Sequence, residues 1–89
     1  MHLDGETYTG IRIDTKPAPI VLILGKKGFL MCGYLNMEAA DKVGAVAASI
    51  SGVNTFEDLL NKDVMKISIR AREQGLTDGM KGREALKYL

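Results

Sequence analysis

The pattern of apolar positions along the chain predicts a β-sheet built around one hairpin. Residues 20–24 form an unbroken aliphatic run, which is typical of a central strand covered on both faces. A second apolar run covers residues 29–35, and the turn between the two runs, 25–28, begins and ends with glycine. Two apolar runs across such a short turn predict a β-hairpin.

A further strand is predicted over residues 7–13, where Ile11 and Ile13 flank Arg12 in the alternation of a strand. The Asp4-Gly5 dipeptide before it is a tight-turn signal and predicts a short partner strand near the N-terminus. Two prolines follow this strand. Because proline fixes φ and lacks the backbone donor, this segment is expected to be a connection.

The stretch 45–51 is ambiguous, because its alanines favour a helix while its apolar and polar residues alternate as in a strand. Gly44 provides a stop before it, and Gly52 follows it. We therefore expect a strand here, added to the sheet.

Helices are predicted over three segments, 37–43, 55–61 and 81–88. Asn36 stands where an N-cap is needed for the first, and Gly44 stands at its C-cap position. Thr55 and Asp58 form a pair that resembles a capping box for the second. The stretch 64–74 fits strand alternation in its first part and a helical stripe over its length, so periodicity alone leaves both open.

Composition is that of an ordinary globular domain, with 46% hydrophobic and 26% charged residues. Twelve Lys and Arg face eleven Asp and Glu, a balance that argues against a strongly basic nucleic-acid binder. No apolar run approaches the roughly 20 residues that span a bilayer. The N-terminus also lacks the pattern of a signal peptide. We therefore expect a cytoplasmic protein with neither nucleic acid nor membrane as partner.

Histidine and cysteine each occur once, as His2 and Cys32. A single cysteine cannot form an intrachain disulfide. A transition-metal site needs several His, Cys or carboxylate ligands that converge. The sequence therefore predicts no built-in metal centre, and nothing in it indicates a cofactor.

Three segments together resemble the YunC-like family of small bacterial and archaeal proteins, a domain of unknown function. They are residues 28–36, 55–60 and 75–86, and the piece from 79 to 86, GMKGREAL, is the most specific of them. The resemblance covers nearly the whole chain and favours a helix over 64–74. It implies a small α/β protein and supplies no catalytic residue.

These observations predict one domain over residues 1–89, with an α+β fold arranged as a two-layer sandwich. Its sheet is mostly antiparallel or mixed, has four to five strands, and is covered on one face by the helices. The apolar content is high for a chain of 89 residues. For that reason we expect a homo-oligomer, most simply a two-fold dimer.

The first candidate site is the entry to the last helix, formed by Gly79, Lys81, Gly82 and Arg83. Free N–H groups at the start of a helix and two cationic side chains would suit a small anion. Capping and packing explain the same residues without a ligand. This loop is the basis for our first hypothesis, a non-catalytic module that binds a small anionic ligand or a protein partner.

The second candidate is Cys32, which would act as the nucleophile of a thiol enzyme, supported by Asn36 or Asp41. A reactive thiol needs a lowered pKa, and most unpaired cysteines simply pack as small apolar side chains. The third hypothesis is a structural component whose only role is to assemble. We favour the binding module, because the sequence shows no convergent catalytic constellation.

Overall fold

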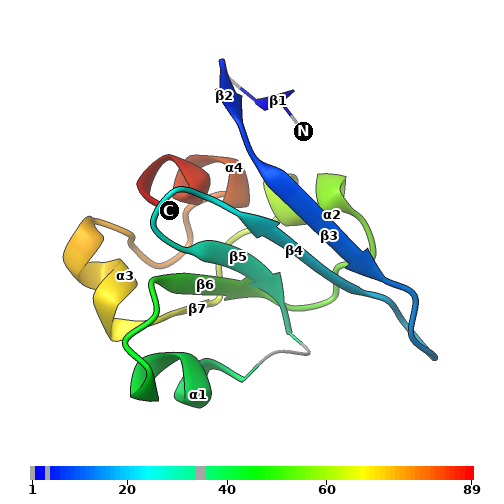
Figure 1. The fold of residues 1–89 in the computed structure, drawn as a ribbon, viewed down its shortest axis with the longest axis horizontal. Coiled ribbons are helices and arrows are strands. Elements are labelled where there is room, and N and C mark those ends of the chain that lie inside the picture. The colour runs from blue at the N-terminus through cyan, green and yellow to red at the C-terminus, as the bar shows by residue number, and fades with distance from the viewer. Residues whose placement is uncertain (1, 4, 34–35) are drawn as a thin grey trace.

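The computed structural model describes residues 2–3, 5–33 and 36–89 and contains a five-stranded mixed sheet and a separate two-stranded sheet (Figure 1). The large sheet has the order β3-β4-β5-β6-β7. These strands are Thr9–Ile13, Ile20–Leu24, Phe29–Cys32, Ala47–Ile50 and Lys66–Ile67. Only β5 and β6 run parallel; the other neighbours are antiparallel. The predicted α+β class and strand number are confirmed.

The predicted strand over 7–13 is in fact two strands of different sheets. Strand β2 (Glu6–Thr7) pairs with β1 (His2–Leu3) as the expected short hairpin, and β3 then joins the large sheet. Tyr8 separates them. Its side chain is buried in the larger hydrophobic core of the protein, which we call the main core. At Tyr8 the backbone therefore leaves the two-stranded sheet before it enters the five-stranded sheet.

The predicted hairpin is formed by β4 and β5. Its turn also holds Leu89, whose carbonyl oxygen accepts hydrogen bonds from the N–H of Gly28 at 2.8 Å and from the N–H of Lys27. Gly25 has to be glycine, because a Cβ there would overlap the backbone of Leu89. The backbone N–H groups of Lys27 and Gly28 are thus engaged by the chain itself.

Helix α1 (Met37–Lys42) connects the parallel strands β5 and β6. The predicted N-cap is confirmed, since the Asn36 side chain accepts from the N–H of Glu38 at 2.8 Å. Gly44 follows the helix with φ +73°, a conformation that favours glycine. Strand β6 confirms the prediction for 45–51, although its pairing is parallel to β5.

Helix α2 (Phe56–Asn61) begins with reciprocal capping. The Thr55 hydroxyl accepts from the N–H of Asp58 at 3.1 Å, and the Asp58 carboxylate accepts from the N–H of Asn54 at 3.0 Å. That last hydrogen bond is the main reason why the pKa of Asp58 is lowered. The capping pair recognised in the sequence therefore marks the true start of the helix.

The stretch 64–74 was expected to be one helix, and this prediction is wrong for its first part. Residues 66–67 form β7, and helix α3 (Ile69–Gln74) begins only after Ser68. Ser68 makes the break, because its buried hydroxyl accepts from the N–H of Ala47 at 3.0 Å and of Ala71 at 3.1 Å. It also donates to the carbonyl of Ala45 at 2.8 Å.

The segment predicted as a helix over 81–88 consists of α4 (Gly82–Ala85) followed by a 3-10 turn, η1 (Leu86–Tyr88). Helices α2 and α4, together with Ala71 of α3, pack against the main core on one face of the sheet. A second, smaller core lies on the other face, where α1 covers part of β5 and β6. The helices therefore lie on both faces, whereas the sequence led us to expect one.

No helix in the described part of the chain has the length and apolar character needed to cross a membrane. The same ranges contain no group of three or more His, Cys, Asp or Glu side chains that could hold a metal ion.

We expect Ser68→Ala to lower the free energy of unfolding by about 2–4 kcal/mol, because it leaves buried donors and an acceptor without their partner. Urea denaturation measures the loss. Ser51→Ala, at an exposed serine, is the matched control and should change stability by less than about 0.5 kcal/mol. Equal stability of the two variants would contradict the role assigned to the buried hydroxyl.

Candidate functional site

The loop predicted to bind an anion, residues 79–83, is engaged by its own surroundings. Lys81 pairs with Asp63 at 2.8 Å, and the two residues also form an isolated β-bridge. The N–H of Gly82 donates to the carbonyl of Lys62 at 3.0 Å. The N–H groups of Glu84 and Ala85 donate to the carbonyl of Lys81, each at 3.0 Å.

The two glycines of this loop serve the fold in different ways. Gly79 has φ +82° and open space around it, whereas Gly82 is buried where a Cβ would overlap the carbonyl oxygen of Leu59. Gly82 thus lets α4 contact α2 closely. Arg83 is exposed on the four-residue helix α4. The anion site at Gly79, Lys81, Gly82 and Arg83 stays a prediction, and we see capping and packing as the roles that the geometry gives these residues.

We expect Gly82→Ala to lower the free energy of unfolding by at least about 3 kcal/mol, since the new methyl group has to displace backbone. Gly79→Ala should cost only about 1–2 kcal/mol, the penalty for a side chain at positive φ. Thermal or urea unfolding of the two variants tests this order. A reversed order would show that the close contact between α2 and α4 is not what requires Gly82.

Cys32 lies at the carboxyl end of β5, and only 2% of the residue is exposed. It belongs to the main core and also borders a shallow cleft of about 370 Å³ between the ends of β5 and β6. The two residues predicted to assist it are occupied elsewhere. Asn36 caps α1, and Asp41 accepts from the N–H of Ile69 at 2.8 Å. The burial of Cys32 favours a role in packing over a role in catalysis.

We expect the Cys32 thiol to react with an aromatic disulfide reagent at least about a hundredfold more slowly in the folded protein than in urea, because reaction requires local opening. The release of the coloured thiolate measures both rates. Rapid stoichiometric labelling of the folded protein would instead favour the thiol-enzyme hypothesis.

The sequence did not predict one apolar feature of the described surface. Register places Ile11 opposite Leu22, and Leu22 opposite Met31, so all three lie on the face that carries α1. Leu24 lies opposite Phe29 on the same face, and Ile13 is two residues beyond Ile11. We call five of these residues the open face: Ile11, Ile13, Leu22, Leu24 and Phe29.

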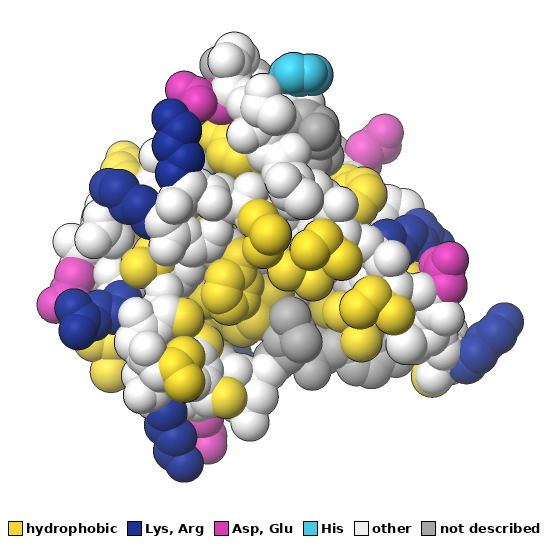
Figure 2. All heavy atoms as spheres, viewed as in Figure 1, with side chains coloured by type: hydrophobic (Ala, Val, Ile, Leu, Met, Phe, Trp, Pro, Cys, Tyr) yellow, Lys and Arg dark blue, Asp and Glu magenta, His cyan; other side chains and the backbone are white. Residues whose placement is uncertain are grey.

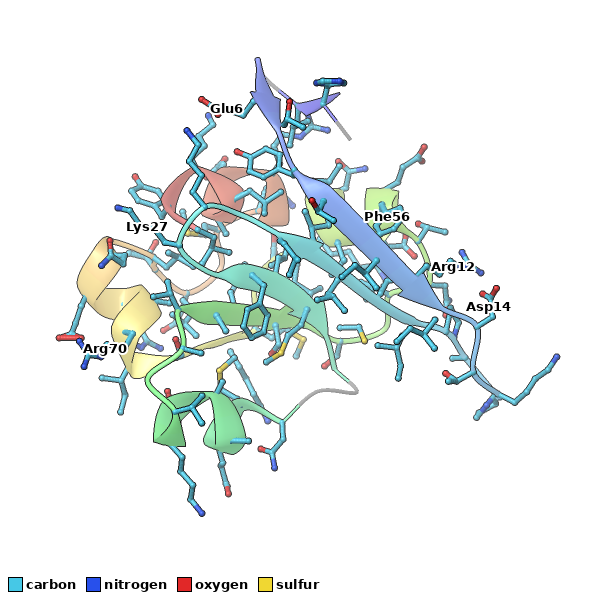
Figure 3. All side chains as sticks on the ribbon, viewed as in Figure 1. Glu6, Arg12, Asp14, Lys27, Phe56 and Arg70 are labelled. Atoms are coloured by element: carbon cyan, nitrogen blue, oxygen red, sulfur yellow. The ribbon has the colours of Figure 1, made fainter. Side chains whose placement is uncertain are left out.

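The other residues that the structure describes cover the open face only in part. Ile11, Ile13 and Leu24 pack in neither core cluster, and Ile13 is 50% exposed. Figure 2 shows hydrophobic side chains gathered over the middle of this side of the molecule, with Lys and Arg towards its rim. Arg12 and Asp14, at the far end of β3, pair with each other at 2.8 Å (Figure 3).

An apolar groove of about 360 Å³ runs beside the open face, between β5 and α1. Phe29 belongs to both. The other lining residues are Met31, Asn36, Ala39, Ala40, Val43 and Ala45. Val43 stands at its margin and is 81% exposed. None of these groove residues is charged, and neither is any residue of the open face. The described part of this side therefore presents two uncharged surfaces next to each other.

Comparison with known proteins places these features in a family without an established activity. The model of a domain of unknown function, DUF1805, matches residues 31–89. The uncharacterized protein YunC of Bacillus subtilis (strain 168) is 28% identical over 88 residues, which cover 94% of this chain and 87% of YunC. These matches confirm the resemblance that the sequence showed.

A solved structure is also similar along the whole chain. It is the crystal structure of a protein of unknown function, TA1206, from Thermoplasma acidophilum, with a TM-score of 0.95 and 37% sequence identity. The match covers 100% of this chain and 87% of that one. It supports the fold described above.

Proposed function

The chain belongs to the DUF1805 family, a domain of unknown function, and we propose that it is a non-catalytic binding module whose open face pairs with a second copy of the same chain. The observation that carries this proposal is the apolar surface formed by the exposed Ile13 and the half-buried Ile11 and Leu24, which pack in neither core cluster. Monomeric proteins seldom leave a large contiguous apolar surface in water. A partner that covers this surface removes the free-energy cost of exposing it to water.

A second copy suits this surface because the open face and the groove lie next to each other on one side of the molecule. A two-fold axis brings the open face of each copy onto the groove of the other, so that both contacts form together. We infer that Ile13 of one copy lies against the groove margin at Val43 of the other. Neither surface carries a charge, and the net charge of +1 per chain opposes pairing only weakly.

The size of the molecule is compatible with the proposed dimer. A standard interface buries about 800 Å² per partner, and the broad side of the molecule measures 33 × 31 Å. A nucleic acid or an anionic membrane would require lysine and arginine on the binding face. The open face and its groove contribute none among the described residues.

Sedimentation equilibrium over the micromolar range should give twice the mass of one chain. Ile13→Lys and Val43→Glu should each raise the dimer dissociation constant at least about tenfold, because each buries an unpaired charge. Met65→Lys is the control, since Met65 is 61% exposed and lies outside the open face. A wild-type chain that remains a monomer, or Ile13→Lys that pairs normally, would contradict the proposal.

Mixing the two charged variants tests the arrangement itself. In a heterodimer of Ile13→Lys with Val43→Glu, one contact joins the new lysine to the new glutamate and the other contact is unchanged. We therefore expect the mixture to pair more tightly than either variant alone. No gain on mixing would show that Ile13 and Val43 do not meet across the interface.

A further inference from the structure

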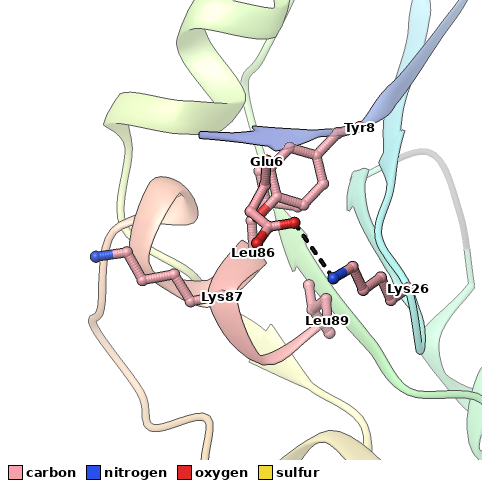
Figure 4. A pocket seen from close by; sticks show the side chains of 6 residues that line it. All are labelled: Glu6, Tyr8, Lys26, Leu86, Lys87 and Leu89. Atoms are coloured by element: carbon pink, nitrogen blue, oxygen red, sulfur yellow. Dashed lines mark ion pairs between the residues drawn. The ribbon is translucent and has the colours of Figure 1, made fainter. Parts of the chain in front are cut away.

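A second surface feature lies away from the open face, where the N-terminal arm, the β4–β5 turn and the last residues meet. There a cavity of about 300 Å³ is lined by six residues (Figure 4): Glu6, Tyr8, Lys26, Leu86, Lys87 and Leu89. It shares no residue with the open face or its groove. Dimer formation and occupation of this cavity can therefore be tested separately.

The floor of the cavity is apolar and fixed in place. Tyr8, Leu86 and Leu89 are all buried, with at most 9% of each residue exposed. Leu89 is anchored, because its carbonyl oxygen accepts from the backbone N–H groups of Lys27 and Gly28. The floor thus exists without a ligand and requires little rearrangement to receive one.

The rim of the cavity is charged. Lys26 pairs with Glu6 across the opening, with 3.3 Å between Nζ and Oε2 (Figure 4). Both side chains are largely exposed, at 80% and 51%, so the pair is hydrated and easily opened. Lys87 also lines the cavity, but its ammonium group points away from Glu6 and Lys26 (Figure 4).

We propose that this cavity binds a small carboxylic acid with an apolar body. The carboxylate takes the place of Glu6 at Lys26, while the body rests on Tyr8, Leu86 and Leu89. The volume is at the lower end of ligand cavities, which restricts the ligand to a small molecule. A bare inorganic anion leaves the apolar floor uncovered and gains nothing from it.

Titration with hexanoate, followed by NMR of the protein, tests the proposal. Acetate, 1-hexanol and inorganic phosphate are the comparison probes. Affinity should rise up to about fourfold for each methylene group that is buried between acetate and hexanoate. Hexanol and phosphate should both bind at least about tenfold more weakly than hexanoate, because each lacks one of the two contacts. No saturable shift with hexanoate, or phosphate binding as tightly, would overturn the proposal.

Three variants locate the site. Lys26→Met keeps the aliphatic stem and should weaken hexanoate binding at least about tenfold. Glu6→Gln removes the competing carboxylate and should strengthen it severalfold. Lys27→Met is the matched control: Lys27 is the neighbouring lysine of the same turn, its ammonium group bonds Gln74 at 3.2 Å, and its loss should change nothing. Equal affinity of the Lys26 and Lys27 variants, or weaker binding by Glu6→Gln, would overturn the assignment.

Discussion

The parallel pairing of β5 with β6 determines which parts of the sheet are covered. Parallel neighbours need a crossover connection, and the crossover places its helix on one face of the strands that it joins. Here that helix is α1, whose six residues span only about 9 Å. It covers β5 and β6 and stops there. The antiparallel strands β3 and β4 are joined by a turn that brings no helix, so their half of the face stays open.

The opposite face is closed by short elements that depend on individual hydrogen bonds. Helices α2, α3 and α4 have four to six residues each, too few to be stable alone. Ser68 ties α3 to the start of β6, and Asp41 ties α1 to α3. The absence of a side chain at Gly82 lets α4 approach α2. The described residues thus cover one face within a single chain and leave part of the other open, which is where we propose that a second copy binds.

Local patterns predicted the local structure well. The aliphatic run of β4, the cap at Asn36 and the pair of Thr55 with Asp58 act over a few residues, so the sequence could identify them. What it missed depends on contacts between distant segments. Lys81 meets Asp63 across a bridge, and the cavity under Lys26 unites three parts of the chain. Neither these contacts nor the uncovered half of the sheet leaves a periodic signal.

The proposed dimer requires two copies to meet through the uncovered half of the sheet. The most direct test is an isotope-filtered NMR experiment on a mixture of ¹³C-labelled and unlabelled chains. It detects only contacts between copies. We expect intermolecular signals from the methyl groups of Ile11, Ile13 and Leu24 on β3 and β4, and from Val43. A dimer whose intermolecular signals come from other residues, or a sample with none, would contradict the account.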